Sequence, residues 1–315
     1  MYEFIYNYLS IPFGMIIGFF YEISNNYVLS LLLMTICVKL VLLPSSIKQQ
    51  KGMVKTQRMQ PKIKRIREKY AGNQQKMNEA MNELYAKEGY SSMTGGCLPM
   101  LIQLPVMMGV FGVNYRLLSY VLKIPKDVIE VLKNEALKLS LTDYEKSALR
   151  LELTAITRFG EIDKSAIPAE IVTQINEFIE NFKFLGIDLS RTPDTKMGLD
   201  MLWLIPILTG VTSLAMGVYT WLRQKQTNPE MAKNPSTGCM TFMSPAMSVY
   251  FSFLFPASVG IYIIMSSALS FVQMIITNKV FSPKKMLAKA MVEETINRRA
   301  KEKVLKSIAE KKNEN

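Results

Sequence analysis

Lys39 is the residue whose surroundings most strongly suggest a chemical role. It is a formally charged residue deep in the apolar run Tyr27 to Leu43, and a charge at the centre of a membrane helix costs about 2.5 to 3.5 kcal/mol on insertion scales. One explanation is that the lysine reaches the lipid headgroups, since it lies one helical turn before Leu43. The other is that Lys39 stays charged inside a polar cavity, where it attracts an acidic segment of an incoming chain.

Polar side chains recur at helical spacing in each of the apolar runs. In any one run, such a stripe is more often a helix-packing contact than a functional surface. If the stripes converge, however, they enclose a wet groove in which Lys39 can remain charged. The residues expected to line this groove are Lys39, Thr35, Gln103, Asn114, Ser213, Ser248, Tyr262, Ser266 and Gln273.

The residue types that are missing exclude most catalysis and metal binding. The sequence has no histidine, so it holds no Ser-His or Cys-His nucleophile and no His metal site. Cys37, Cys97 and Cys239 are far apart, which excludes a CxxC redox pair and a Cys-rich zinc site. Gly95-Gly96 is not followed by the GK[ST] of a phosphate-binding loop. We therefore expect no enzyme, no cofactor and no metal.

The composition indicates a membrane protein. A hydrophobic content of 49% beside a formal net charge of +12 suggests apolar blocks in lipid and basic blocks at its anionic surface. Runs of about 17 to 25 apolar residues can cross a bilayer, and they predict an all-α polytopic protein with five transmembrane helices. These spans are expected at 27–47, 97–122, 199–222, 240–257 and 258–278. In 1–26, Pro12 and Gly14 interrupt an apolar stretch, which indicates an interfacial or re-entrant segment.

The charges of the connecting segments predict the orientation. Residues 48–96, 223–239 and 279–315 are rich in Lys and Arg, whereas 123–198 carries 11 basic and 13 acidic residues. Because basic segments stay on the cytoplasmic side, we expect the N-terminus outside and the C-terminus in the cytoplasm. The 123–198 connection is then an extracytoplasmic helical loop that folds as a small cap. On one face of its helix after Pro168 lie Ile171, Ile175, Phe178 and Phe182.

Residues 48–96 show the pattern of a cytoplasmic helical hairpin. Apolar residues recur at helical spacing before and after Ala71-Gly72-Asn73, where Gly72 is the expected breaker and Asn73 the expected cap. The basic face of the hairpin is either a solvated surface near anionic lipid or a docking surface for a protein or an RNA. Its cations are Lys62, Arg65, Lys69 and Lys76, with Lys87 near the end.

Several motifs, in order along the chain, resemble those of the YidC-type membrane protein insertases, over roughly residues 20 to 282. They are Val38-Lys39-Leu40-Val41-Leu42-Leu43-Pro44, Met59-Gln60-Pro61 through Glu68-Lys69-Tyr70, Gly95-Gly96-Cys97-Leu98-Pro99-Met100-Leu101-Ile102-Gln103-Leu104-Pro105, Phe184-Leu185-Gly186-Ile187-Asp188-Leu189-Ser190, and Phe255-Pro256-Ala257. Lys39 stands where the family usually has arginine, and lysine keeps the charge but not the planar fork. Ser91-Ser92 replaces a common Asn-Pro.

The resemblance implies five core helices around a hydrophilic groove that is open to the cytoplasm and to lipid. It implies that the positive residue of the first span engages acidic parts of nascent membrane proteins, and that a mobile hairpin helps to receive them. Other implied partners are the Sec translocon and the ribosome through the basic tail 279–315, while the charge pattern itself predicts contact with anionic lipids. That tail has one helical apolar face and could instead lie on anionic lipid. The alternative function is a small-solute channel or transporter, although no internal repeat or mid-span carboxylate supports it.

Overall fold

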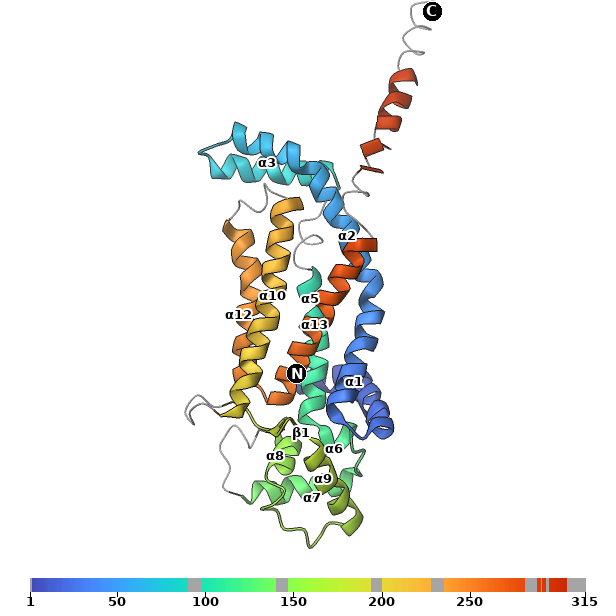
Figure 1. Ribbon diagram of the computed structural model, residues 1–315, viewed down its shortest axis with the longest axis vertical. Coiled ribbons are helices and arrows are strands. Elements are labelled where there is room, and N and C mark those ends of the chain that lie inside the picture. The colour runs from blue at the N-terminus through green and yellow to red at the C-terminus, as the bar shows by residue number, and fades with distance from the viewer. Residues whose placement is uncertain are drawn as a thin grey trace, which may run out of the picture. The chain divides into compact units, whose positions relative to one another are not determined.

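The computed structural model describes residues 2–89, 98–139, 147–193, 200–227, 235–280, 288–289, 291–292 and 295–304. The described chain is mostly helical, with one two-stranded antiparallel sheet (Figure 1). It divides into two compact units. The first unit comprises Met1–Leu42, Pro99–Trp221 and Gly238–Phe271, and the second comprises Leu43–Leu98, Leu222–Thr237 and Val272–Asn315.

Long helices with apolar stretches form most of the first unit, and all of them except α1 continue into the second. They are α1 (Tyr2–Ser24), α2 (Tyr27–Lys69), α5 (Leu98–Tyr115), α10 (Leu204–Thr227), α12 (Pro235–Leu254) and α13 (Ala257–Val280). Among the described residues, three stretches are long and apolar enough to cross a membrane: Tyr27–Gln49, Met201–Gln226 and Ala257–Val280. The chain is therefore an all-α protein with membrane-spanning candidates in α2, α10 and α13. The short 3-10 helix η1 (Met201–Trp203) leads into α10.

The N-terminal segment, predicted to be interfacial or re-entrant, contains α1, which continues through Pro12 and Gly14 as one helix. Proline removes a single backbone hydrogen bond, which surrounding packing can offset. The glycines of α1 have a different role, since they allow close contact with α6 (Leu117–Tyr120). A Cβ on Gly14 would lie 2.5 Å from the Tyr120 ring, and one on Gly18 would lie 2.6 Å from the Tyr120 carbonyl oxygen.

In the second unit, the helix break occurs where the sequence predicts it. The long helix α2 ends at Lys69, and α3 runs from Gln74 to Lys87. Gly72 has a φ of +94°, which favours glycine, and the Asn73 side chain accepts a hydrogen bond from the Lys76 N–H at 3.0 Å. The predicted N-cap residue of α3, Asn73, is thus confirmed. The second unit buries Met59 and Ile63, two residues of the predicted apolar stripe.

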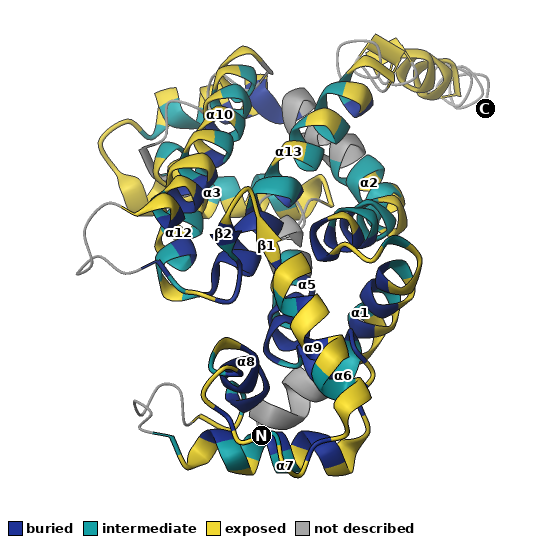
Figure 2. Cartoon of the chain, turned by 60° about the horizontal axis from the view of Figure 1, so that its bottom comes forward, coloured by how far each residue is buried: buried dark blue, intermediate teal, exposed yellow. Residues whose placement is uncertain are grey.

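The described residues of 117–139 and 147–193 in the first unit form a small helical domain, called the cap below. Its elements are α6, α7 (Lys126–Leu137), α8 (Leu151–Thr157), α9 (Ala169–Asn181), β1 (Lys183–Phe184) and β2 (Ile187–Asp188). As predicted, a helix follows Pro168 and buries Ile175 and Phe178, and Phe182 is buried just after it. The Tyr27 ring packs edge-on against Phe182 with centroids 4.7 Å apart, which joins α2 to the cap. Figure 2 shows α8 as the most completely buried helix of the cap.

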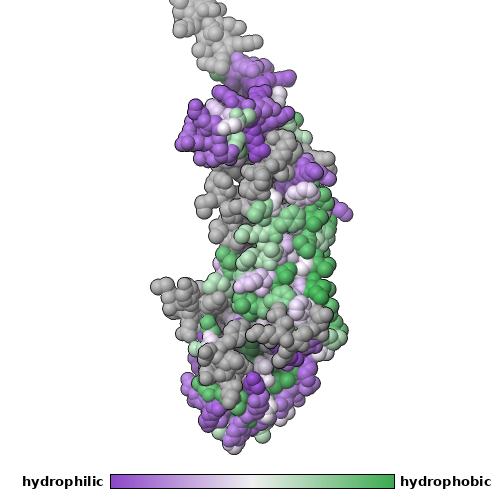
Figure 3. Space-filling view, turned by 90° about the vertical axis from the view of Figure 1, so that its left-hand side faces the viewer, coloured by the Kyte–Doolittle hydropathy of each residue, from purple (hydrophilic) through white to green (hydrophobic). Residues whose placement is uncertain are grey.

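Small residues bring α10, α12 and α13 close together within the first unit. A Cβ on Gly217 would lie 3.0 Å from the Pro245 ring, and one on Gly260 would lie 2.3 Å from Ile205. The opposite faces expose large apolar side chains, seen as the green surface in Figure 3. On α10 and α12 these include Ile207, Val211, Leu214, Val218, Met243, Met247 and Tyr250. Such continuous apolar surface is suited to lipid.

Candidate functional site

Lys39 of α2 is half-buried, and its ammonium group is bound to a hydroxyl on α13. The Nζ atom donates to Ser270 Oγ at 2.7 Å, and Ser270 Oγ donates in turn to the Ser266 carbonyl at 2.6 Å. Within the part of the chain that the structure describes, no carboxylate forms an ion pair with Lys39. One hydroxyl dipole does not neutralise a full charge, so this cation can still accept a negatively charged partner.

A second polar contact lies on the same helix as Ser270. Gln103 of α5 donates from Nε2 to the Tyr262 hydroxyl at 3.3 Å. Tyr262, Ser266 and Ser270 are spaced four residues apart, so they share one face of α13. This α13 polar face therefore meets Lys39 from α2 and Gln103 from α5. Tyr262 and Ser266 are themselves buried.

The side chains of Thr35 and Asn114 form hydrogen bonds within the helical bundle of the first unit. Thr35 is buried and donates to the Leu31 carbonyl at 2.6 Å. The fully buried Asn114 accepts from the Tyr27 hydroxyl at 2.8 Å and donates to the Val110 carbonyl at 2.9 Å. Asn114 therefore holds α5 to α2. Tyr27 was not among the predicted site residues, although a buried phenol generally requires a hydrogen-bond partner.

The polar residues predicted on α10 and α12 lie apart from these contacts in the hydrogen-bond network. Ser213 is buried, and its hydroxyl has no hydrogen-bond partner among the described residues. Ser248 is half-buried and donates to the Ser244 carbonyl one turn earlier at 3.0 Å. No hydrogen bond in the described part of the chain links either serine to Lys39 or to the α13 polar face.

The remaining predicted residues belong to the second unit. Gln273 donates from Nε2 to Ser46 Oγ at 3.0 Å, which links α13 to α2 within that unit. The four hairpin cations Lys62, Arg65, Lys69 and Lys76 are all exposed. Lys62 forms an ion pair with Glu88, and the Lys69 ammonium lies 5.3 Å from the Tyr70 ring centroid. The exposed cations form a positive surface on the hairpin.

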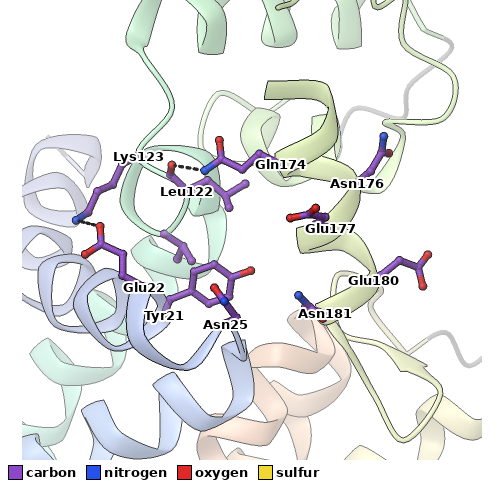
Figure 4. A pocket seen from close by; sticks show the side chains of 11 residues that line it. Tyr21, Glu22, Asn25, Leu122, Lys123, Gln174, Asn176, Glu177, Glu180 and Asn181 are labelled. Atoms are coloured by element: carbon purple, nitrogen blue, oxygen red, sulfur yellow. Dashed lines mark hydrogen bonds and ion pairs between the residues drawn. The ribbon is translucent and has the colours of Figure 1, made fainter. Parts of the chain in front are cut away.

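A pocket of about 690 Å³ lies between α1 and α9 in the first unit (Figure 4). On one side Lys123 forms an ion pair with Glu22, and on the other Gln174 donates to the Leu122 carbonyl at 3.1 Å. Burial raises the pKa of the Tyr21 phenol, against the effect of its hydrogen bond with Asn181. Since these contacts join α1 to the cap, we assign the pocket a structural role.

Long apolar helices, with a half-buried cation on α2 hydrogen-bonded to a polar face of α13, define a helical membrane protein. The chain belongs to the 60Kd inner membrane protein family, whose sequence profile matches residues 19–285. This match covers well over half of the chain and includes Lys39, Gln103 and the α13 polar face.

Individual relatives carry a functional name. A protein from Nitratidesulfovibrio vulgaris (strain DP4) is 40% identical over 106 residues, which are 34% of this chain and 20% of the relative. One from Fusobacterium nucleatum is 36% identical over 35% of this chain and 54% of the relative. One from Syntrophobacter fumaroxidans is 26% identical over 87% of this chain and 38% of the relative. Each is named membrane protein insertase YidC. The chain thus spans between about a fifth and about half of these relatives.

Proposed function

We propose that this protein is a membrane protein insertase, which inserts small integral membrane proteins and helps them to fold. The observation that carries the proposal is the half-buried Lys39, which is hydrogen-bonded to Ser270 and has no carboxylate partner among the described residues. The family membership and the names of the relatives support it. The substrates proposed are nascent membrane proteins with short acidic outward segments.

In this proposal, a groove lowers the cost of drawing a polar segment into the bilayer. Lys39 attracts the acidic side chains, while hydroxyl and amide groups take the place of water around the passing backbone. No covalent bond forms or breaks. The proposed lining consists of Lys39, Gln103, Tyr262 and Ser266, with Thr35, Asn114, Ser213 and Ser248 at its margins.

The proposed topology follows from the charge of the connections. Five spans, at 27–47, 97–122, 199–222, 240–257 and 258–278, surround the groove in a bacterial cell membrane. The N-terminus lies outside and the C-terminus in the cytoplasm, so that the cap is outside and the hairpin inside. The exposed cations of the hairpin, Arg65 and Lys76 among them, would contact anionic lipids or incoming chains, with the Sec translocon as a further partner.

A reconstitution experiment tests the function directly. The purified chain is placed in otherwise protein-free vesicles, and a small acidic single-span protein is added. We expect the outward segment of the substrate to become protected from external protease only in vesicles that contain the chain. If the vesicles instead conduct ions or take up solutes and insert no polypeptide, the protein is a channel or transporter and the proposal is wrong.

The basic tail gives a separate prediction about the ribosome. Residues 295–304 are helical and expose Ile296 and Val304. If this helix binds ribosomal RNA, phosphate contacts dominate, and binding weakens steeply with salt. We expect the full-length chain to cosediment with ribosomes in detergent and a chain that ends at Phe281 not to do so. Equal cosedimentation of both chains would exclude the tail as the ribosome-binding segment.

A further inference from the structure

A loop of the cap binds the first turn of α13 through main-chain hydrogen bonds. The Ala257 N–H donates to the Arg191 carbonyl at 2.8 Å, and the Ser258 N–H donates to the Leu189 carbonyl at 3.0 Å. The first N–H groups of any α-helix lack a partner within the helix. The loop carbonyls therefore complete the start of α13, and Leu189, Ala257 and Ser258 are all fully buried at this contact. We call residues 188–191 with this contact the latch.

A short β-hairpin, formed by β1 and β2, leads into the latch, and its geometry is set by its turn. The strands β1 and β2 pair Lys183 with Asp188 and Phe184 with Ile187, which leaves Leu185 and Gly186 as a two-residue loop. Both have positive φ, 50° and 79°, as a type I′ turn requires. Glycine takes this conformation at no steric cost, and leucine takes it only under constraint. The turn thus sets the direction in which the chain leaves the β-hairpin and enters the latch.

Asp188 then shapes the latch itself. Its Oδ1 atom accepts from the Ser190 N–H at 2.9 Å and from the Ser190 hydroxyl at 2.6 Å. The Leu189 N–H donates to the Phe182 carbonyl at 3.2 Å. These bonds hold the backbone so that the carbonyls of Leu189 and Arg191 both point toward α13. The Asp188 side chain does not itself bond to α13 in the described structure.

The latch holds the start of α13, and the polar contacts of α13 lie further along the same helix. The position of the helix start therefore affects those contacts. After Ala257 and Ser258 come Tyr262, bonded to Gln103, and Ser270, bonded to Lys39. A helix rises about 1.5 Å and turns about 100° per residue. A shift of α13 by one residue would therefore turn Ser270 away from Lys39. Residues at the latch can thus control a contact about 20 Å along the helix axis from Ala257.

We propose that the latch sets the axial position and rotation of α13, and that Asp188 is a positioning residue for the contact between Ser270 and Lys39. The effect on insertion rests on the proposed function, whereas the effect on the position of α13 does not. The inference assigns a role to the cap motif Phe184 to Ser190, which has no part in the groove.

Thiol crosslinking measures the position of α13 without reference to activity. Lys39→Cys and Ser270→Cys are introduced into a chain whose native cysteines are replaced by serine, and a short bifunctional thiol reagent is added in vesicles. We expect Asp188→Ala to lower the crosslinking yield severalfold. Asp188→Asn should retain the yield, because its amide oxygen can accept the same bonds from Ser190.

A second variant removes one latch hydrogen bond directly. Ala257→Pro lacks the N–H that binds the Arg191 carbonyl, yet proline is favoured at the first position of a helix. The matched control is Ser258→Ala, because that hydroxyl is buried with no hydrogen-bond partner among the described residues, and the main-chain bond to Leu189 remains. We expect lower crosslinking with Ala257→Pro and wild-type crosslinking with Ser258→Ala. A circular-dichroism spectrum and a gel-filtration profile check that each variant is folded.

Insertion is measured in parallel in chains that keep Lys39 and Ser270. If crosslinking and insertion fall together in Asp188→Ala and Ala257→Pro, the latch positions α13 for insertion. If crosslinking falls and insertion does not, the latch still positions α13, and the proposed groove function fails instead. If both folded variants crosslink as well as the parent, the latch does not position α13, and the inference is overturned.

Discussion

Replacing Lys39 by alanine should lower the insertion of a small acidic single-span protein by about tenfold or more. A hydrogen bond to a charged group contributes about 1.5 to 3 kcal/mol, and each 1.4 kcal/mol corresponds to about tenfold in an equilibrium constant. Lys39→Ala removes the cation that binds Ser270 and with it the charge proposed to attract an acidic segment in the groove. Lys39→Arg keeps the charge and adds bidentate donors, so we expect it to retain insertion.

The assay is protease protection of the substrate in reconstituted vesicles, at equal amounts of folded insertase. Lys126→Ala is the matched control, because it removes the same charge from an exposed position on the cap. A second substrate, in which the acidic residues are replaced by their amides, tests whether the effect of Lys39 depends on the negative charge of the substrate. Its insertion should depend little on Lys39, since a pairwise interaction disappears when either partner is neutral. Equal insertion by wild type, Lys39→Ala and Lys39→Arg would remove Lys39 from the mechanism.

Local patterns were sufficient to predict several parts of the fold. The helix break at Gly72 depends on the backbone freedom of glycine, and the N-cap of α3 at Asn73 depends on one side-chain hydrogen bond from the Lys76 N–H. These residues lie within one short segment of the sequence. The apolar stripe after Pro168 likewise identified a helix whose Ile175 and Phe178 are buried. In both cases the physical cause is contained in the segment itself, so one sequence is enough.

Features that depend on distant contacts were harder to predict. The pattern of Pro12 and Gly14 in α1 did not reveal that Gly14 and Gly18 pack against Tyr120. The partner of Asn114 is Tyr27, 87 residues away. The polar stripes suggested that Lys39 has hydroxyl neighbours, but the stripe on α13 could not be chosen over the others. The hydrogen-bond partner of Lys39, Ser270, is 231 residues away in the sequence, and only the folded chain identifies it.

Replacing Glu152 by alanine should destabilise the cap. Glu152 of α8 is only 3% exposed, and it joins three helices. Its carboxylate accepts from the Ser119 N–H of α6 at 3.0 Å and from the Ser119 hydroxyl at 2.8 Å, and it lies 3.3 Å from the Lys133 ammonium of α7. Glu152→Ala leaves the Ser119 groups unpaired, which costs about 1 to 3 kcal/mol. Lys133 is 30% exposed and can turn to water, so its contribution is smaller.

Hydrogen exchange of the amides of α6, α7 and α8 measures this effect as a free energy of local opening. We expect that free energy to fall by about 1 to 3 kcal/mol in Glu152→Ala, and by less in Glu152→Gln, because the amide oxygen can still accept from Ser119. Glu130→Ala is the control, since Glu130 is exposed on α7. Unchanged exchange in Glu152→Ala would mean that apolar packing alone holds the three helices. A fall confined to these helices would show that a buried carboxylate organises the cap, separately from the latch that contacts α13.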